Sequence, residues 1–174
     1  MNNIIFLVGN YGVGKSSIIK EPILSQQEFL IEIKPNLYVL GDTIAGADSL
    51  SPYPKNKVVK TLLNHRDKNI IIAGIYYTTK KDILFLSKYF NVTLIYLKTS
   101  FEENAKRIAL RGNQINIDTY NSKLKSHYSL IKGTKGFRKL FIVDNDRSLN
   151  EVKEEVYKII EDETTRTNAS TPRL

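Results

Sequence analysis

Eight residues near the start of the chain have the types and the spacing of a phosphate-binding loop. The segment Gly9-Asn10-Tyr11-Gly12-Val13-Gly14-Lys15-Ser16 matches the pattern G-x-x-x-x-G-K-[ST]. Its three glycines permit backbone conformations that a Cβ would forbid, so the loop's N–H groups can point inward around an anion. The pattern predicts that Lys15 reaches the β- and γ-phosphates of a nucleotide and that the Ser16 hydroxyl binds Mg²⁺. Ser17 is expected to complete this phosphate site.

The segments on both sides of this loop are those that the motif requires. The continuous apolar run at residues 4–8 is typical of a strand buried on both faces. A helix is expected from about Gly14 to near Pro22, whose ring removes a backbone donor. A strand end followed by a helix N-terminus is a favourable place for phosphate.

The rest of the chain alternates predicted strands and helices. Further strands are expected at residues 37–40, 70–73, 92–97 and 140–143. Apolar residues at helical spacing predict helices around residues 58–63 and 83–86, over most of 101–131, and at 149–160. This order predicts an α/β fold, a three-layer sandwich in which a five-stranded parallel sheet carries helices on both faces.

A chain of 174 residues suits one domain, which we expect to span residues 1–162. Ligands of parallel sheets bind beyond the carboxyl ends of the strands. That rule places the phosphate-binding loop, Asp42 and residues 74–77, 98–100 and 144–147 along one rim. Residues 163–174 have little apolar content and are expected to form a flexible tail.

Composition excludes several classes of protein. The chain has no cysteine, which excludes disulfides, thiolate metal sites and cysteine nucleophiles. We expect no membrane span and no signal peptide, and hence a cytoplasmic protein. The net charge of +8 has two explanations. Either the partner is a polyanion such as nucleic acid, or lysine is simply used freely throughout the chain, since the lysines are spread out.

The chain resembles the P-loop nucleoside and nucleotide kinase superfamily, particularly the small kinases of bacteriophages. Residues 94–103, followed by Arg107 and Arg111, look like the strand, helix and arginine-bearing lid of these kinases. Residues 141–146 look like the last strand and the adenine-side loop, and residues 40–42 with 46–50 are similar to the acceptor-side loop of phage relatives. The resemblance implies ATP and Mg²⁺ as cofactors and, for a phage protein, the host cytoplasm as the location.

The resemblance also implies roles for three arginines. A lid around residues 107–125 would bring Arg107 and Arg111 to the transferring phosphate, and their spacing of four puts both on one helix face. The alternative is that Arg107 pairs with Glu103 and that both arginines are solvated. Arg147 would lie over the adenine. Asn113–Tyr120 would continue the lid as a polar stretch with little reason to pack.

Several polar and aromatic residues are candidates for contacts to the phosphate acceptor: Asp42, Asp48, Tyr53, Tyr76 and Tyr77. Asp42 could accept a proton from an acceptor hydroxyl, or could be a turn residue that bonds its own backbone. Asp48 has the same two interpretations. The tyrosines could stack on a base or wall the pocket, or could be ordinary half-buried packing.

The chain departs from the family pattern at the third strand. Related kinases commonly carry an acid at its end, whereas residues 70–81 contain no Asp or Glu before Asp82. Either Asp42 or Asp48 supplies the acid, or Mg²⁺ is held by Ser16, phosphates and water alone. His65 and His127 have no motif partner and are expected at the surface. Four lysines that follow the lid could touch phosphates or, as we expect, lie on a solvated helix face: Lys123, Lys125, Lys132 and Lys135.

These observations favour an ATP-dependent phosphotransferase that acts on a nucleoside- or nucleotide-type acceptor, as a monomer or homodimer. A first alternative is a kinase for a hydroxyl carried by DNA, either a 5′ end or a hydroxymethylated base such as 5-hydroxymethyluracil. A base within a duplex would have to be unstacked first. A second alternative is a P-loop NTPase that is not a kinase.

Overall fold

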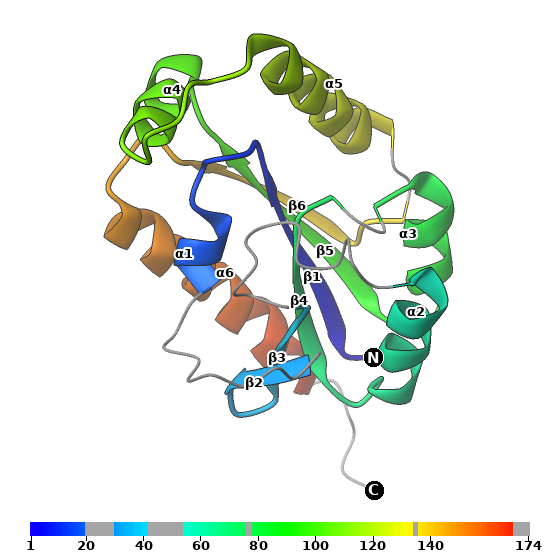
Figure 1. Ribbon diagram of the computed structural model, residues 1–174. Helices are drawn as coiled ribbons and strands as arrows, with labels where there is room; N and C mark the ends of the chain where they lie inside the picture. Colours follow the sequence, from blue (N-terminus) through cyan, green and yellow to red (C-terminus); the bar gives the residue numbers. More distant parts are fainter. Residues whose placement is uncertain (20–29, 42–53, 76–77, 134–135, 169–174) are drawn as a thin grey trace, which may run out of the picture.

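A twisted sheet runs through the centre of the molecule, with helices on both of its faces (Figure 1). The computed structural model describes residues 1–19, 30–41, 54–75, 78–133 and 136–168. The sheet has the strand order β2-β3-β4-β1-β5-β6. The strands are β1 (Asn3–Gly9), β2 (Leu30–Lys34), β3 (Leu37–Leu40), β4 (Asn69–Ala73), β5 (Asn91–Lys98) and β6 (Lys139–Asp144). The helices are α1 (Lys15–Ile19), α2 (Lys55–Asn64), α3 (Lys80–Leu86), α4 (Phe101–Ala109), α5 (Ile117–Gly133) and α6 (Leu149–Asn168).

Five of the strands are parallel and correspond to the five that the sequence predicts. The sheet also has an edge strand that the sequence analysis missed, β2, which pairs antiparallel with β3. Its sequence, Leu-Ile-Glu-Ile-Lys, alternates apolar and charged residues because one face of the strand is exposed. A search for continuous apolar runs therefore passes over it. The turn between β2 and β3 contains Asn36, whose φ of 60° lies in the left-handed region.

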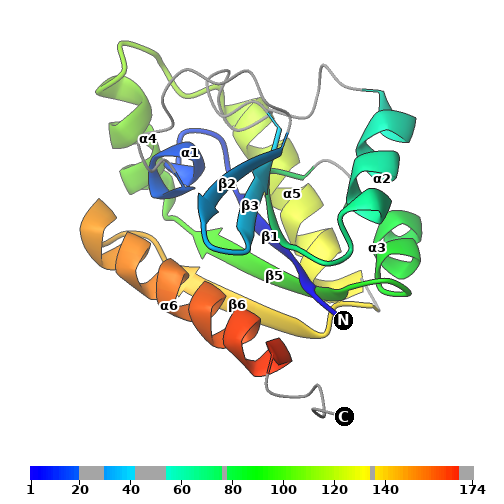
Figure 2. The ribbon, with the colours of Figure 1, turned by 90° about the horizontal axis from the view of Figure 1, so that it is seen from below.

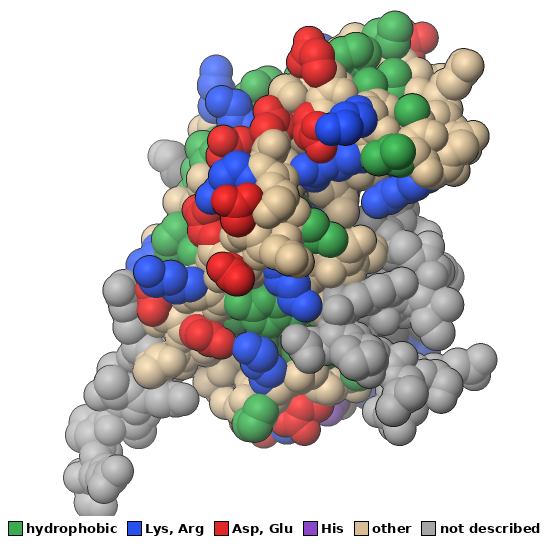
Figure 3. Space-filling view, turned by 90° about the vertical axis from the view of Figure 1, so that its left-hand side faces the viewer, with side chains coloured by type: hydrophobic (Ala, Val, Ile, Leu, Met, Phe, Trp, Pro, Cys, Tyr) green, Lys and Arg blue, Asp and Glu red, His purple; other side chains and the backbone are tan. Residues whose placement is uncertain are grey.

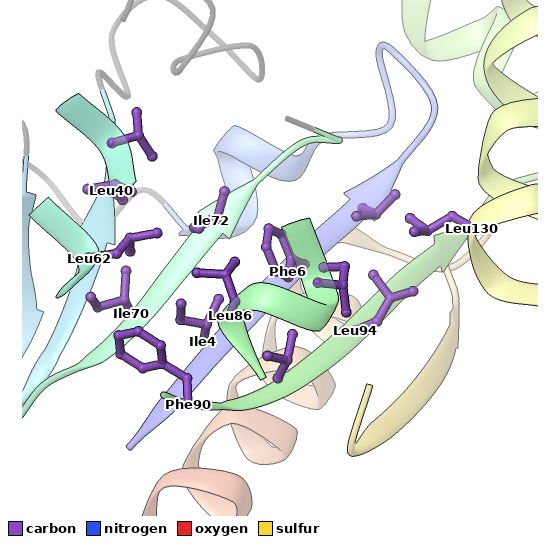
Figure 4. Close-up of a cluster of buried hydrophobic side chains, with 14 of the residues drawn as sticks. Ile4, Phe6, Leu40, Leu62, Ile70, Ile72, Leu86, Phe90, Leu94 and Leu130 are labelled. Atoms are coloured by element: carbon purple, nitrogen blue, oxygen red, sulfur yellow. The ribbon is translucent and has the colours of Figure 1, made fainter. Parts of the chain in front are cut away.

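Consecutive residues of β1 point to opposite faces of the sheet, which explains why the whole strand is apolar. On one face Ile4 and Phe6 pack with buried side chains of α2, α3 and α5, among them Leu62, Leu86 and Leu130 (Figure 4). On the other face β1 packs against α1 and α6 (Figures 1 and 2). The result is the predicted three-layer arrangement.

The last helix, α6, is longer than the sequence predicts, because it continues to Asn168. The expected tail is therefore wrong for residues 163–168, and residues 169–174 lie outside the described ranges. Glu163 is only 4% exposed and forms an ion pair with Lys139 of β6. The Asn3 side chain donates to its carbonyl oxygen. Polar contacts, rather than apolar content, thus hold this last part of α6 against the sheet.

None of the helices in the described part of the chain combines the length and the apolar character that crossing a membrane requires.

Candidate functional site

The phosphate loop, residues 9–16, connects the end of β1 to the start of α1 as predicted. Gly12 and Gly14 have φ angles of 77° and 92°, in the left-handed region that side chains rarely adopt. A Cβ at Gly12 would lie 2.6 Å from Cγ1 of Ile108, a buried residue of α4. Glycine is therefore needed here both for the turn and for the close approach of α4.

Lys15 lies beneath this loop, with only 5% of the residue exposed. Its ammonium group donates to the carbonyl oxygens of Gly9 at 2.7 Å and Asn10 at 2.8 Å. Ser16 is half-buried and Ser17 exposed in the first turn of α1. The loop therefore brings together one cation, two hydroxyl groups and turn amides, which is the donor set that a phosphate chain needs.

Two buried asparagines hold the loop from neighbouring elements. Asn104 of α4 donates to the Tyr11 carbonyl at 2.9 Å, and Asn145, which follows β6, donates to the Val13 carbonyl at 3.0 Å. Both side chains are fully buried. Asn145 also donates to the Thr99 hydroxyl at 2.8 Å. These hydrogen bonds occupy carbonyl oxygens of the loop and hold the loop in one shape.

The sequence alone does not identify these asparagines, because they belong to no spaced motif. A weak signal was present, since Asn145 lies within the segment that resembles the adenine-side loop, and Asn104 lies three residues before Arg107 on the helix assigned to the lid.

The start of α5 packs against the other side of the loop. The Asn10 side chain donates to the Tyr120 carbonyl at 3.2 Å, and the Tyr11 hydroxyl bonds both the N–H and the carbonyl of Asn116. Tyr120 is buried and meets the Phe101 ring edge to face, with centroids 5.1 Å apart. The prediction that Asn113–Tyr120 has little reason to pack is therefore wrong, because backbone groups at Asn116 and Tyr120 contact the loop.

Arg107 is tied to protein groups from three directions. Its guanidinium forms an ion pair with Glu103 at 2.8 Å and donates to the carbonyls of Val13 at 3.1 Å and Asn145 at 2.6 Å. The Arg107 guanidinium holds the pKa of Glu103 below its usual value. The alternative interpretation is therefore right about the pairing of Arg107 with Glu103 but wrong about solvation of Arg107, whose side chain is 17% exposed and links α4 to the phosphate loop. Arg111, one turn further on, is exposed.

A cavity of about 370 Å³ opens between the phosphate loop, α4 and the start of α6. Two apolar side chains line it although they are strongly exposed, Leu110 at 79% and Leu149 at 43%. Its charged edge is made by five side chains, Glu103, Lys106, Arg107, Arg111 and Arg147. Arg147 is also paired with Glu155, which raises the pKa of its guanidinium. Apolar walls next to a phosphate loop suit a planar base attached to a phosphate chain.

His127 of α5 is buried, so the prediction that it lies at the surface is wrong. It is 1% exposed, and its ring lies 5.7 Å from the Tyr96 ring. Burial first, and then the positive charges of Lys15 and Lys123, lower the pKa of His127 to about 4. The imidazole is therefore neutral near pH 7. Helix α5 packs on the sheet through His127. Because histidine is polar, the residue type alone does not indicate that this position belongs to the core.

The other histidine and the lysines of α5 also differ in part from expectation. His65 is half-buried, with its Nδ1 2.8 Å from the Thr61 carbonyl. Lys123 is half-buried, and its Nζ lies 5.7 Å from the centre of the Tyr11 ring. Lys125 and Lys132 are exposed as predicted, and Lys135 lies outside the described ranges.

The residues predicted to contact the acceptor lie outside the described ranges: Asp42, Asp48, Tyr53, Tyr76 and Tyr77. Within those ranges, no group of three or more His, Cys, Asp or Glu side chains could hold a metal ion. Of the predicted ligands of Mg²⁺, only Ser16 is therefore placed, and a hydroxyl together with nucleotide phosphates is a donor set that Mg²⁺ accepts.

Charge is mixed on the face that carries α4 and the start of α6. Acidic and basic side chains alternate there and form no continuous basic surface (Figure 3). Part of the reason is pairing, since Lys106 and Arg107 both contact Glu103.

Comparison with known proteins identifies the fold. No protein-family model matches the chain, and no curated protein matches its sequence. Solved structures do match. The YorR protein from Bacillus subtilis, crystallised in complex with phosphorylated GDP, has a TM-score of 0.58 at 17% identity, over 91% of this chain and 95% of that one. A gluconokinase from Sinorhizobium meliloti has a TM-score of 0.51 at 15% identity, over 97% and 98%. The chain therefore has the α/β fold of P-loop kinase structures, with a mostly parallel sheet and flanking helices.

Proposed function

We propose that this protein transfers the γ-phosphoryl group of ATP to a nucleoside- or nucleotide-type acceptor, as the small kinases of bacteriophages do. The observation that carries the proposal is Lys15, held by two carbonyls beneath a glycine-rich loop that opens onto a cavity with apolar walls. The fold shared with a gluconokinase, and with a protein crystallised with phosphorylated GDP, supports it.

The described residues have separate tasks in this reaction. The loop amides and Lys15 bind the β- and γ-phosphates, and the base lies between Leu110 and Leu149. The Ser16 hydroxyl would hold Mg²⁺, which would neutralise charge on the phosphates. Arg111 is exposed at the edge of the base cavity, from which its guanidinium can reach phosphate oxygens. Arg107 holds the loop through Val13 and reaches the phosphate only by exchanging one of its present contacts.

Asp42 is our candidate for the group that orients or deprotonates the acceptor hydroxyl. It follows Gly41 directly after β3, the strand that pairs with β4. Strand β4 in turn lies beside β1 and hence beside the phosphate loop. The described end of β3 is thus on the same rim of the sheet as the loop, and Asp42 is the first acidic residue after it in the sequence.

Two alternatives follow from particular observations. The net charge of +8 favours an acceptor hydroxyl on DNA, although the mixed charge in Figure 3 argues against a continuous DNA track on that face. The absence of an acidic residue from the sequence of β4 and from Gly74 and Ile75 favours an NTPase without an acceptor.

The test is incubation with γ-labelled ATP and separate panels of nucleosides, nucleotides and DNA. The proposal predicts label on a free nucleoside or nucleotide. Label on DNA alone would instead support a kinase that acts on a hydroxyl carried by DNA. Release of phosphate with no labelled acceptor would support an NTPase.

A further inference from the structure

A second and larger cavity, of about 640 Å³, lies between α5 and the segment that leads from β4 into α3. Its volume is within the range of small-molecule sites. The floor is apolar, made by Ile75 and by Leu130, a buried residue of α5 that belongs to the core cluster of Figure 4. The walls carry hydroxyl and ammonium groups.

The hydroxyl groups of this cavity present acceptors to a ligand. Thr78 donates its proton to the Ile75 carbonyl, Thr79 to the Asp82 carboxylate and Ser126 to the Ser122 carbonyl. A hydroxyl that donates a hydrogen bond to a protein group still has lone pairs that can accept another hydrogen bond. These three groups can therefore accept hydrogen bonds from the O–H or N–H groups of a ligand, Thr79 with one remaining lone pair because it already accepts from the Asp82 N–H.

The charge of the cavity is positive. Lys80 and Lys125 line opposite walls, and no carboxylate is among the lining residues within the described ranges. The neighbouring Asp82 is 9% exposed and is already paired with Lys55 and Thr79. Two lysines on a cavity whose described lining residues include no acid suit a single anionic group such as a phosphate or carboxylate.

The cavity is close to the phosphate loop through two elements. Beyond β4, the Gly74 N–H bonds the carbonyl of Leu7 in β1, two residues before the phosphate loop begins. On the other wall, α5 receives the Asn10 side chain at Tyr120. His127, next to Ser126 on that helix, is near enough to Lys15 for the lysine charge to lower its pKa. The two elements that line the cavity therefore also contact β1 and the phosphate loop.

We infer that this cavity is the acceptor site, and that the acceptor is a small polyhydroxylated anion. Its hydroxyl groups donate to Thr78, Thr79 and Ser126, its C–H face packs on Ile75 and Leu130, and its anionic group lies between Lys80 and Lys125. The inference rests on the proposed function, which supplies the phosphate donor. A nucleoside monophosphate and a sugar phosphate or sugar acid share this chemistry. An extended nucleic acid strand does not, because it needs a row of cations along its backbone.

The experiment measures binding by calorimetry, separately from turnover. The probes are UMP, ribose 5-phosphate and glucuronate, with ribose, inorganic phosphate and a single-stranded oligonucleotide as comparisons. We expect at least one of the three hydroxylated anions to bind more tightly than ribose or phosphate, and to accept label from γ-labelled ATP. Label on UMP agrees with the nucleotide-type acceptor of the proposed function, whereas label on a sugar derivative alone would replace that acceptor class and leave the phosphate transfer standing.

Matched lysine variants locate the binding site. Lys80→Gln and Lys125→Gln should each weaken binding of that anion about 10-fold, the usual effect of losing a charge-assisted hydrogen bond. Lys81→Gln and Lys132→Gln remove exposed charges from the same two helices outside the cavity and should leave binding unchanged. All four variants should bind Mg²⁺-ATP normally.

The inference is overturned if none of the three anions binds, if the oligonucleotide alone binds, or if all four lysine variants weaken binding equally. Normal Mg²⁺-ATP binding in those cases leaves the proposed function standing. If an anion binds but receives no label while ATP is bound, the cavity is a ligand site but not the acceptor site.

Discussion

At the scale of single residues, the site depends on uncharged polar side chains that are completely buried. Asn104 and Asn145 each give an amide proton to a carbonyl of the phosphate loop. His127 is buried in α5 against Tyr96 in its neutral form. Burying polar groups is costly, and the bonds from the two asparagines to loop carbonyls offset part of that cost, although Oδ1 of both asparagines and Nδ1 of His127 have no hydrogen-bond partner among the described residues.

Replacing Asn145 by Asp should weaken nucleotide binding. The carboxylate cannot donate to Val13 or Thr99, and it brings a buried negative charge next to a loop carbonyl. We expect Mg²⁺-ATP affinity to fall at least about 10-fold, with a loss of roughly 2 kcal/mol in the free energy of unfolding. Asn150→Asp, at an exposed position on α6, is the control and should change neither quantity. Unchanged affinity in Asn145→Asp would show that Asn145 does not hold the loop.

The buried His127 predicts a dependence of stability on pH. Its pKa is about 4 in the folded protein, below the ordinary value of 6.5, so the unfolded chain binds more protons between these values. The stabilising contribution is complete above pH 6.5 and is lost as the pH falls toward 4. The loss amounts to roughly 2–3 kcal/mol.

Urea denaturation at a series of pH values measures this loss. His127→Phe keeps a ring against Tyr96 and removes the titration, so its stability should fall less steeply over the same pH range. Equal slopes for the two proteins would contradict the buried neutral imidazole.

The sequence predicts the residues of the phosphate loop because their spacing is fixed by the shape of a phosphate chain. It does not predict Asn104 or Asn145, because a side chain that reaches a loop carbonyl can come from any element that passes nearby. His127 was misplaced for a related reason. Its burial follows from the way α5 lies on the sheet, and a lone histidine carries no such signal.

At the scale of elements, the loop and α4 fit each other through Gly12 and Ile108. Gly12→Ala would add a Cβ 2.6 Å from Cγ1 of Ile108 and would strain a residue whose φ is 77°. We expect a loss of about 2 kcal/mol or more in stability and a clear fall in ATP affinity. Gly133→Ala is the control, because Gly133 lies in α5 and its Cβ would meet nothing within 4 Å. Circular dichroism melting and calorimetry with ATP measure both effects.

Strands that are buried on both faces could be predicted from the sequence, whereas a strand with one exposed face could not. The five parallel strands are nearly continuous apolar runs wherever helices cover both faces, as in β1 and β4. Strand β2 has one exposed face and was missed. The segment before α5 seemed too polar to pack, but it packs through backbone groups, which no side-chain pattern reveals.

At the scale of the whole molecule, the last helix is held to the first and last strands of the sheet. Glu163 near the end of α6 pairs with Lys139 of β6, and its carbonyl receives the side chain of Asn3 at the start of β1. Glu163→Ala should therefore lower the free energy of unfolding by about 2 kcal/mol, since it leaves a partly buried lysine without this carboxylate. The neighbouring Asp162 is exposed, and Asp162→Ala should change stability little. Equal stability of the two variants would mean that this end of α6 is not held against the sheet.

The central claim is that the phosphate loop and Lys15 bind the phosphates of ATP. Calorimetric titration of the protein and of Lys15→Ala with ATP in the presence of Mg²⁺ tests it most directly. We predict saturable binding of one ATP per chain that is lost in Lys15→Ala, while circular dichroism shows the same fold for both proteins. Equal binding by the two proteins, or no binding by the unaltered chain, would contradict the claim.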